Sequence, residues 1–482
     1  MQTKYQKGTF GYWWTVTLGK EDIAGKTYEG DIDCSECGIT SLKGCPEVVK
    51  GIFNCSYNKL TSLKGCPEVV GKSFDCSRNN LTSLKGCPEV VGGNFYCSDN
   101  KLKSLEGCPK KVRDFDCSDN KLKSLEHCPN IVEGSFYCSN NELTSLKYCP
   151  EEIKGKFNCS NNKLTSLEHC PNIVEGSFYC SWNRLTSLKY CPKKVRDFEC
   201  LANGLTSLEH CPNIVKGNFN CSRNKLTSLE HCPKVVEGIF NCSYNKLTSL
   251  KGCPEVVWKN FYCLDNKLTS LEYCPKEVGN FDCSGNKLTS LKGCPNTVKG
   301  YFRCIYNKLT SLEGCPKVVG EDLDCSHNNL TSLEGCAKEV GRDLNCSWNK
   351  FKSLEDTKKV GLTSLKGCPE KVGRDLNCSN NLLTSLEGCA KEVGRDLNCS
   401  GNKLTSLKGC PEVIKRNLNI SENLSLSTVG IEKLIKIGGN VYFDKNVDCL
   451  KNLWENFKNS LDIKGENFVE YALSSFNAQK SK

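Results

Sequence analysis

The chain has 482 residues, of which 25% are charged and 38% hydrophobic, and its formal net charge is +10. Spread over this length, the charge makes the protein only mildly basic, so composition alone does not indicate a nucleic-acid partner. No stretch approaches 18 consecutive apolar residues, and we therefore expect no membrane-spanning helix.

The N-terminal residues 1–31 lack the pattern that fills the rest of the chain. Their aromatic residues alternate with Thr and Gly: Tyr5, Phe10, Tyr12, Trp13 and Trp14. Because polar residues interrupt these aromatics, no apolar run reaches the length of a signal peptide. We expect an aromatic strand or hairpin that caps a repeat array, since the end of such an array would otherwise expose its core.

From residue 32 onwards, the cysteines define an internal repeat. Thirty-six of the 38 cysteines fall into two registers, one from Cys34 to Cys399 and one from Cys45 to Cys410, and every proline directly follows a cysteine of the second register. The first register advances by 20 or 21 residues per step, apart from a step of 32 between Cys346 and Cys378. This period predicts a solenoid, in which each turn contacts only its neighbours.

Each turn contains a short strand with one buried face. Phe95 and Cys97 are two residues apart, so both point to one side and Tyr96 points to the other. The stretch from Val112 to Leu122 reads V-x-x-F-x-C-x-x-N-x-L and carries the spacing L-x-x-L-x-L-x-x-N-x-L. This spacing resembles the leucine-rich repeat family, and the resemblance covers roughly residues 32–430.

The resemblance implies an α/β-type solenoid, a leucine-rich repeat horseshoe with a parallel concave β-sheet and mostly extended or 3₁₀ convex segments. The short repeats with proline are most similar to bacterial and phage-type members, and proline disfavours a full helix in the return segment. An asparagine recurs in the turns from Asn58 to Asn423, with Cys37 in its place in the first turn. We expect this asparagine ladder to be buried and to bond backbone groups.

The array is predicted to have about 19 turns over residues 32–437, with an irregular turn at 349–367. Lys350–Leu365 contains two L-x-S-L-type segments and no strand between them, which predicts a bulge or kink with lost ladder hydrogen bonds. Residues 438–482 are expected to form a C-terminal cap. Five residues there have the spacing of an amphipathic helix: Leu450, Leu453, Trp454, Phe457 and Leu461. A protein-binding tail is the alternative.

The cysteines are interpreted as core residues, because free cysteine is among the most buried residue types. Disulfide or metal ladders are the alternatives, but Cys34 and Cys37 form the only C-x-x-C pair. We expect no cofactor and no metal site. Four histidines precede a Cys-Pro pair, and repeat duplication accounts for them: His127, His169, His210 and His231. Unpaired thiols favour a cytoplasmic protein.

The residues that face outward from the strands vary between turns, whereas the core positions barely change. Large aromatic residues among Asn and Asp are typical of protein-binding surfaces. Neutral drift at solvated positions is the alternative. We predict partner binding by Tyr96, Tyr137, Tyr179, Trp182, Tyr244, Tyr262, Asp116 and Asp282.

Lysine follows the recurring asparagine in most turns, from Lys59 to Lys403, and predicts a cationic rail along one edge. The Asp residues of the adjacent face would repel phosphates, which disfavours nucleic acid. No catalytic arrangement stands out from the repeat background. The sequence therefore indicates a non-enzymatic protein that binds a protein partner through its concave face, and the alternative is a structural or surface-adhesive repeat spacer.

Overall fold

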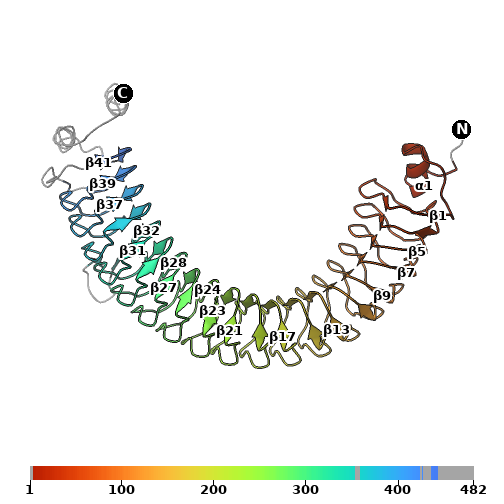
Figure 1. Cartoon of the computed structure of the whole chain (residues 1–482), viewed down its shortest axis with the longest axis horizontal. Coiled ribbons are helices and arrows are strands. Elements are labelled where there is room, and N and C mark those ends of the chain that lie inside the picture. Colours follow the sequence, from red (N-terminus) through yellow and green to blue (C-terminus); the bar gives the residue numbers. More distant parts are fainter. Residues whose placement is uncertain (1–3, 353–358, 424–425, 427–435, 443–482) are drawn as a thin grey trace, which may run out of the picture. The chain divides into compact units, whose positions relative to one another are not determined.

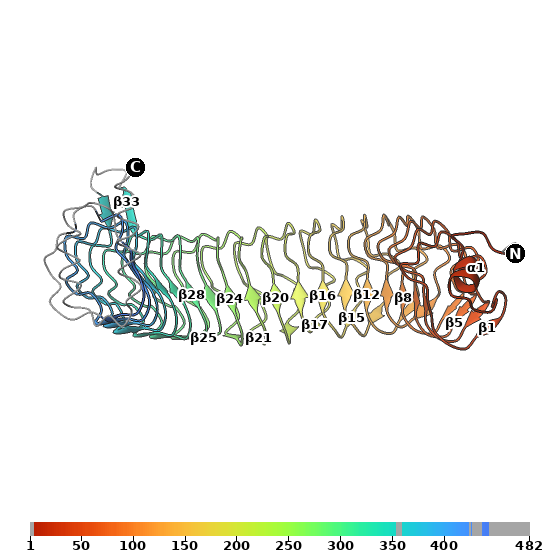
Figure 2. The same ribbon diagram turned by 90° about the horizontal axis from the view of Figure 1, so that it is seen from above.

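The computed structural model of the chain is an array of parallel strands (Figures 1 and 2). It describes residues 4–352, 359–423, 426 and 436–442. The predicted C-terminal helix around Leu450–Leu461 lies outside these residues. The chain divides into two compact units, Met1–Asn245 (unit 1) and Lys246–Lys482 (unit 2). Both units are solenoids with very little helix, and the chain has about 19 turns.

Each turn contains two strands of two residues, which form two separate ladders. The first ladder of unit 1 consists of β2 (Ile32–Asp33), β4 (Phe53–Asn54), β6 (Phe74–Asp75), β8 (Phe95–Tyr96), β10 (Phe115–Asp116), β12 (Phe136–Tyr137), β14 (Phe157–Asn158), β16 (Phe178–Tyr179), β18 (Phe198–Glu199), β20 (Phe219–Asn220) and β22 (Phe240–Asn241). The first ladder of unit 2 consists of β24 (Phe261–Tyr262), β26 (Phe281–Asp282), β28 (Phe302–Arg303), β30 (Leu323–Asp324), β32 (Leu344–Asn345), β36 (Leu376–Asn377), β38 (Leu397–Asn398), β40 (Leu418–Asn419) and β42 (Val441–Tyr442).

The second ladder lies in the return segments. In unit 1 it comprises β1 (Thr27–Tyr28), β3 (Val48–Val49), β5 (Val69–Val70), β7 (Val90–Val91), β9 (Lys111–Val112), β11 (Ile131–Val132), β13 (Glu152–Ile153), β15 (Ile173–Val174), β17 (Lys194–Val195), β19 (Ile214–Val215) and β21 (Val235–Val236). In unit 2 it comprises β23 (Val256–Val257), β25 (Glu277–Val278), β27 (Thr297–Val298), β29 (Val318–Val319), β31 (Glu339–Val340), β35 (Lys371–Val372), β37 (Glu392–Val393), β39 (Val413–Ile414) and β41 (Lys436–Ile437). These segments are extended, and none of the residues described forms a 3₁₀-helix.

The first ladder is the predicted parallel sheet. Each strand lies in register with the equivalent strand of the next turn, so that Phe95 is opposite Phe74 and Phe115. The phenylalanine rings are fully buried and contact one another from turn to turn, with Phe74 stacked on Phe95 at 5.5 Å between centroids and Phe198 edge-on to Phe219 at 5.4 Å. In unit 2 the phenylalanine column ends at Phe302, and Leu323 takes the next position, also fully buried.

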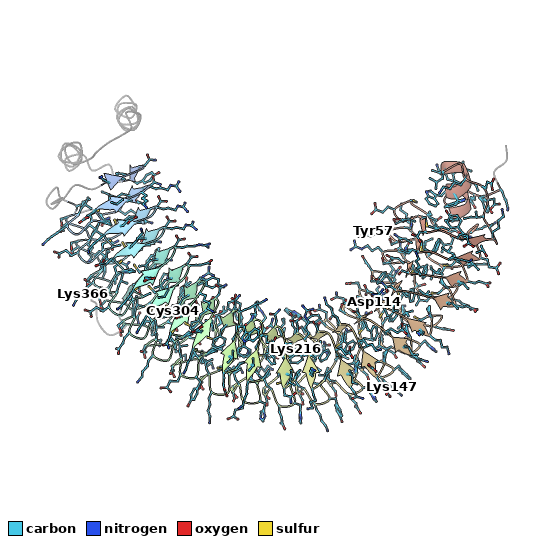
Figure 3. The ribbon with its side chains drawn as sticks, in the orientation of Figure 1. Tyr57, Asp114, Lys147, Lys216, Cys304 and Lys366 are labelled. Carbon is cyan, nitrogen blue, oxygen red and sulfur yellow. The ribbon has the colours of Figure 1, made fainter. Side chains whose placement is uncertain are left out.

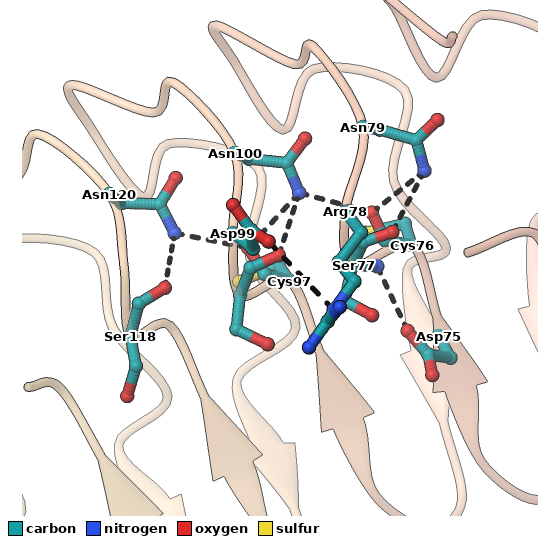
Figure 4. A network of polar contacts seen from close by, with 11 residues as sticks. Asp75, Cys76, Ser77, Arg78, Asn79, Cys97, Asp99, Asn100, Ser118 and Asn120 are labelled. Carbon is teal, nitrogen blue, oxygen red and sulfur yellow. Dashed lines mark hydrogen bonds and ion pairs between the residues drawn. The ribbon is translucent and has the colours of Figure 1, made fainter. Parts of the chain in front are cut away.

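The asparagine ladder bonds backbone groups of two adjacent turns (Figure 4). The Asn100 Nδ2 donates to the carbonyl oxygens of Cys76, Cys97 and Ser98 at 3.1, 3.2 and 3.2 Å. The Asn100 Oδ1 accepts the backbone N–H of Leu81 at 3.0 Å. One amide therefore uses its donors and its acceptor on groups that cannot reach water, which confirms the predicted structural role.

The 20-residue steps have a structural consequence in the second ladder. These steps lead to Cys117, Cys200 and Cys283, and the second ladder is interrupted before the strand of each of these turns, namely β9, β17 and β25. A further interruption, between β11 and β13, follows a step of 21 residues. The turn of β10 has two residues between Val112 and Phe115, whereas the turn of β8 has three between Val91 and Phe95. The missing residue shifts the return segment relative to its neighbour, while the first ladder stays continuous.

The irregular turn at 349–367 differs from the prediction. Strand β32 pairs directly with β36, so no rung of the first ladder is lost. The additional residues include an antiparallel hairpin of β33 (Lys350–Lys352) and β34 (Lys359–Gly361). At the base of this hairpin, the N–H of Leu362 donates to the Asn349 carbonyl at 2.9 Å. The lost-strand prediction was wrong because this segment is an insertion into a complete turn, although its L-x-S-L sequence resembles part of a repeat.

The N-terminal aromatics form helical turns instead of the predicted strand or hairpin. Helix α1 (Phe10–Tyr12) is capped by the Thr9 side chain, which accepts the N–H of Tyr12, and it runs into the π-helical turn η1 (Trp13–Thr17). The buried Phe10 ring packs edge-on against Phe53, with centroids 6.3 Å apart. The Thr9 cap and the consecutive aromatics after it disrupt the two-residue alternation that a strand requires.

Every cysteine of the described part of the chain is a free thiol. The first register is buried and the second is buried or half-buried, as predicted for core residues. Burial raises the pKa of these thiols, for example that of Cys128 to about 12, so they are neutral near pH 7. Cys37 is the exposed exception. It belongs to the turn of β2, where the first ladder begins, and it donates to the Ser35 carbonyl at 3.1 Å.

Candidate functional site

The outward side of the first ladder, which we call the strand face, has three residues per turn. In the turn of β8 these are Asn94, Tyr96 and Asp99, and the Asn94 Nδ2 donates to the Tyr96 hydroxyl at 2.5 Å. In unit 2 the Tyr301 hydroxyl donates to that of Tyr262 at 3.3 Å. We call the places of these three residues in a turn the first, second and third positions. The sequence interpretation included the second and third positions but missed the first. The two-residue alternation could have revealed it, since the residues before and after the strand phenylalanine share a face.

The third position of each turn adopts the left-handed backbone conformation. Its φ values lie between 50° and 58° for all non-glycine residues of this position. Asn, Asp and Gly tolerate this conformation, whereas for residues with other side chains it costs about 1 kcal/mol relative to the right-handed conformation. Five large aromatic residues occupy it nevertheless and are 43–62% exposed: Tyr57, Trp182, Tyr244, Tyr306 and Trp348. In Figure 3, Tyr57 lies on the strand-face side of unit 1 and Lys147 on the opposite side.

The predicted binding residues divide into two groups. Trp182 and Tyr244 occupy third positions and are exposed. The others occupy second positions in the strands and are half-buried: Tyr96, Tyr137, Tyr179, Tyr262, Asp116 and Asp282. Tyr179 and Trp182 belong to the same turn, whereas the rest are distributed over several turns of the two units. Tyr57, Tyr306 and Trp348, which are as exposed as Trp182, were not among the predicted residues.

Arginine side chains of the strand face lie over its tyrosine rings. The Arg78 guanidinium is 4.4 Å from the Tyr57 ring centroid, and that of Arg223 is 4.6 Å from Tyr244. In unit 2 the Arg303 guanidinium is 4.5 Å from Tyr301. These contacts show that rings of this face accept planar cations.

Three consecutive third positions of unit 2 form a column of rings. Tyr306 stacks on His327 with centroids 4.4 Å apart, and His327 stacks on Trp348 at 5.7 Å. In the turn before Tyr306 the third position is Gly285, which has no side chain. The column therefore ends at Tyr306, which is 62% exposed.

Carboxylates dominate the strand face although the whole chain is basic. In unit 1 the face has three cations, Arg78, Lys156 and Arg223, against ten carboxylates: Asp31, Asp33, Glu36, Asp75, Asp99, Asp114, Asp116, Asp119, Asp197 and Glu199. Among the residues of unit 2 that the structure describes, it has one cation, Arg303, against eight carboxylates: Asp265, Asp282, Asp322, Asp324, Asp343, Asp375, Asp396 and Glu422.

The density of carboxylates affects their protonation. Burial raises the pKa of Asp75, and the charges of Asp116 and Asp33 raise it further. Desolvation also raises the pKa of Asp119, with the charge of Asp99 as a smaller contribution in the same direction. Arg78, whose Nε lies 3.8 Å from the Asp99 Oδ2, compensates only part of this charge (Figure 4). The face therefore presents a negative potential that favours a basic partner.

The lysine rail and the histidines lie away from the strand face. Rail lysines such as Lys59 and Lys163 are exposed, and Lys163 pairs with Glu142 at 2.9 Å. His127, His169, His210 and His231 are exposed in return segments, in left-handed positions where other turns carry glycine. The described residues contain no group of three side chains that could hold a metal ion.

No protein-family model and no curated protein sequence matches the chain. Among solved structures, it is similar to YopM from Yersinia enterocolitica WA-314, with a TM-score of 0.66 and 21% identity over 86% of this chain and 91% of that chain. It also matches YopM, a leucine-rich effector protein from Yersinia pestis, with a TM-score of 0.39, 18% identity and coverage of 66% and 83%.

A third similar structure is the functional domain of InlJ from Listeria monocytogenes, with a TM-score of 0.31, 17% identity and coverage of 53% of this chain and 68% of that chain. The first match extends over most of both chains. The spacing of the repeats in the sequence is also that of leucine-rich repeats. The chain has the leucine-rich repeat fold. No helix of the described segments is long and apolar enough to cross a membrane.

Proposed function

We propose that this leucine-rich repeat protein is a non-enzymatic binding protein that captures a protein partner on its strand face. One observation carries the proposal: five large aromatic residues are exposed on this face in left-handed backbone positions. Exposed aromatic residues on a rigid support are the typical anchors of protein interfaces, because they lose little conformational entropy on binding.

The fold does not require aromatic residues at these positions. Other turns carry Asn140, Asn161, Gly285 or Gly401 at the same place, and their strands pair in the same way. Replacing an asparagine by tryptophan there adds backbone strain and exposes apolar surface. Aromatic residues that cost stability and contribute nothing to the core are expected where they bind a partner.

We further propose that the array curves so that the strand face is concave, and that the partner contacts Trp182 and Tyr244 together with the half-buried Tyr96, Tyr137, Tyr179, Tyr262, Asp116 and Asp282. The free thiols support a reducing, cytoplasmic location. A structural or surface-adhesive spacer is the competing function. It predicts that the exposed aromatics can be removed without loss of binding.

The test compares two double variants that remove equally exposed aromatics from opposite sides of unit 1. Trp182→Ala/Tyr244→Ala removes side chains of the strand face that are 53% and 43% exposed. Tyr148→Ala/Tyr190→Ala removes side chains of the return segments that are 49% and 51% exposed and also have positive φ. We expect affinity capture with mass spectrometry to lose its partner for the first variant only.

The expected loss in partner affinity is about thirtyfold or more, since a single buried aromatic anchor contributes about 2 kcal/mol and about 1.4 kcal/mol corresponds to tenfold. Thermal unfolding should be similar for both variants, because neither removes a core contact. Equal capture by parent and strand-face variant would favour the spacer. Loss of capture only in the return-segment variant would place the interface on the opposite side.

A further inference from the structure

Two sets of three successive third positions have the same chemistry, and only one of them contains its own cation. In unit 1 the set is Tyr57, Arg78 and Asp99, with φ values of 53°, 52° and 53°. The Arg78 guanidinium lies 4.4 Å from the Tyr57 ring centroid, and its Nε is 3.8 Å from the Asp99 Oδ2. A planar cation thus lies between a ring and a carboxylate from the two neighbouring turns.

In unit 2 the corresponding positions are Asp265, Gly285 and Tyr306, with φ values of 50°, 67° and 53°. The backbone bonds match: Asp265 N–H donates to Ser284 O at 2.8 Å and Gly285 N–H to Ile305 O at 2.9 Å, as Arg78 N–H donates to Ser98 O at 2.9 Å. The order of ring and carboxylate is reversed, and glycine replaces the central arginine.

The space above Gly285 is suited to a guanidinium group. A carboxylate oxygen of Asp265 lies where a Cβ on Gly285 would be, so the carboxylate leans over the glycine. Successive turns are about 4.8 Å apart, so the backbones of Asp265 and Tyr306 are roughly 10 Å from each other, and Gly285 contributes no side chain between them. On its other side the Tyr306 ring stacks on His327 at 4.4 Å.

The charges around this space favour a cation from outside. Asp265 forms no ion pair within the described residues, and Asp282 lies on the same turn as Gly285. Arg303, which is opposite Asp282 in the strand register, lies over the Tyr301 ring at 4.5 Å. Rail lysines flank both sets, Lys267, Lys287 and Lys308 in unit 2 and Lys59 and Lys101 in unit 1, where Arg78 keeps its place beside them.

We propose that Tyr306, Gly285 and Asp265 form a binding site for the guanidinium group of an arginine side chain supplied by the protein partner. This inference rests on the proposed function and deepens it, because it specifies the chemistry of one partner residue. Arginine fits better than lysine, since its planar group stacks on a ring while its N–H groups reach a carboxylate.

The probes are three fluorescein-labelled hexapeptides of glycine and serine, each with one central residue that is arginine, lysine or citrulline. Fluorescence anisotropy measures the binding of each peptide to the full-length protein. Citrulline has the shape of arginine without its charge. We expect the arginine peptide to bind most tightly and the citrulline peptide least. Tyr306→Ala should weaken arginine binding about threefold or more, which is the effect of losing an exposed cation–π contact. Asp265→Asn should weaken it as well.

Gly285→Arg is the most informative variant, because it reproduces the arrangement of unit 1 with an internal arginine. Arg78 and Arg223 adopt φ values of 52° and 55° at this position, so the backbone conformation allows arginine, but the Asp265 carboxylate must turn aside to make room for the new Cβ. This variant should abolish binding of the arginine peptide while the thermal midpoint is retained. Conversely, Arg78→Gly empties the filled set and should add a second binding site. Tyr57→Ala is the matched control and should leave the Gly285 site unaffected.

Parent-like arginine binding by Gly285→Arg, equal binding of the arginine and citrulline peptides, or no binding of any peptide would overturn the proposal. The proposed function is tested separately by partner capture. If Gly285→Arg captures the partner and Trp182→Ala/Tyr244→Ala does not, the strand face binds the partner and the guanidinium site is wrong. If both variants capture it, the strand-face function itself fails.

Discussion

Replacing one member of the asparagine ladder tests how far a single amide stabilises its turn. In Asn100→Ala each carbonyl that loses the Nδ2 keeps another donor: Asn79 for Cys76 O, Asn120 for Cys97 O and the Arg78 N–H for Ser98 O. The buried Leu81 N–H, in contrast, loses the Asn100 Oδ1 as its acceptor. An unsatisfied buried donor costs about 1–3 kcal/mol, and the small cavity adds about 1 kcal/mol. We therefore expect a loss of about 2–4 kcal/mol.

Asn100→Asp separates the two roles of the amide. The aspartate still accepts the Leu81 N–H but places an oxygen where Nδ2 faced three carbonyl oxygens. At pH 7 we expect this variant to be less stable than Asn100→Ala, because it buries an unpaired charge. Part of its loss should be recovered in acid, where the protonated carboxyl can donate one hydrogen bond.

The assay combines urea unfolding with hydrogen exchange, because a repeat array does not unfold in a single two-state step. Exchange of the Leu81 amide should accelerate in Asn100→Ala. Asn80→Ala is the matched control, because the Asn80 side chain accepts one hydrogen bond, from the exposed Lys101 Nζ at 2.6 Å. Most turns carry lysine at the position of Asn80. If both alanine variants have the same stability, or the Leu81 amide exchanges at the parent rate, the proposed role of the ladder is refuted.

Three further predictions concern single features of the chain. Burial raises the pKa of Asp75, so ionisation of this carboxyl opposes folding at a pH above that pKa. Asp75→Asn should therefore stabilise the protein at pH 7. Urea unfolding from pH 8 to pH 4 should show that this gain in stability shrinks towards acid. Deleting Phe351–Gly361 restores the consensus N-K-L-T-S-L and should leave the thermal midpoint within about 2 °C, because β32 already pairs with β36; a large drop would show that the hairpin stabilises the array. Cys37 is the exposed thiol of the described residues, so Cys37→Ser should remove the fastest phase of reaction with a thiol reagent, and an unchanged fast phase would contradict this.

The sequence alone predicted the parts of the fold that depend on spacing. A period of 20 or 21 residues fixes the register, because a solenoid turn packs only if the same positions point inward each time. Phe95 and Cys97 are buried and Asn100 bonds two turns, as their spacing predicted. These assignments need no knowledge of distant contacts, since each turn meets a near copy of itself.

Other features depended on the three-dimensional arrangement of the turns. The insertion before Leu362 resembles part of a repeat, and only the pairing of β32 with β36 shows that no strand is lost. The N-terminal aromatics form helical turns because a Thr9 cap and packing on Phe53 outweigh the apparent alternation.

The strand face shows the same division between sequence and structure. The first and second rows follow from strand alternation, but the third row does not: Tyr179 is half-buried within its strand, whereas Trp182, three residues later, is exposed at a φ of 54°. The left-handed conformation accompanies contacts between turns that no local pattern encodes, such as the bond from the Trp182 N–H to the Leu201 carbonyl at 2.9 Å. The same stacking brings Arg78 over Tyr57 and leaves Tyr306 beside Gly285, because residues about 21 positions apart become neighbours only when the turns pack together.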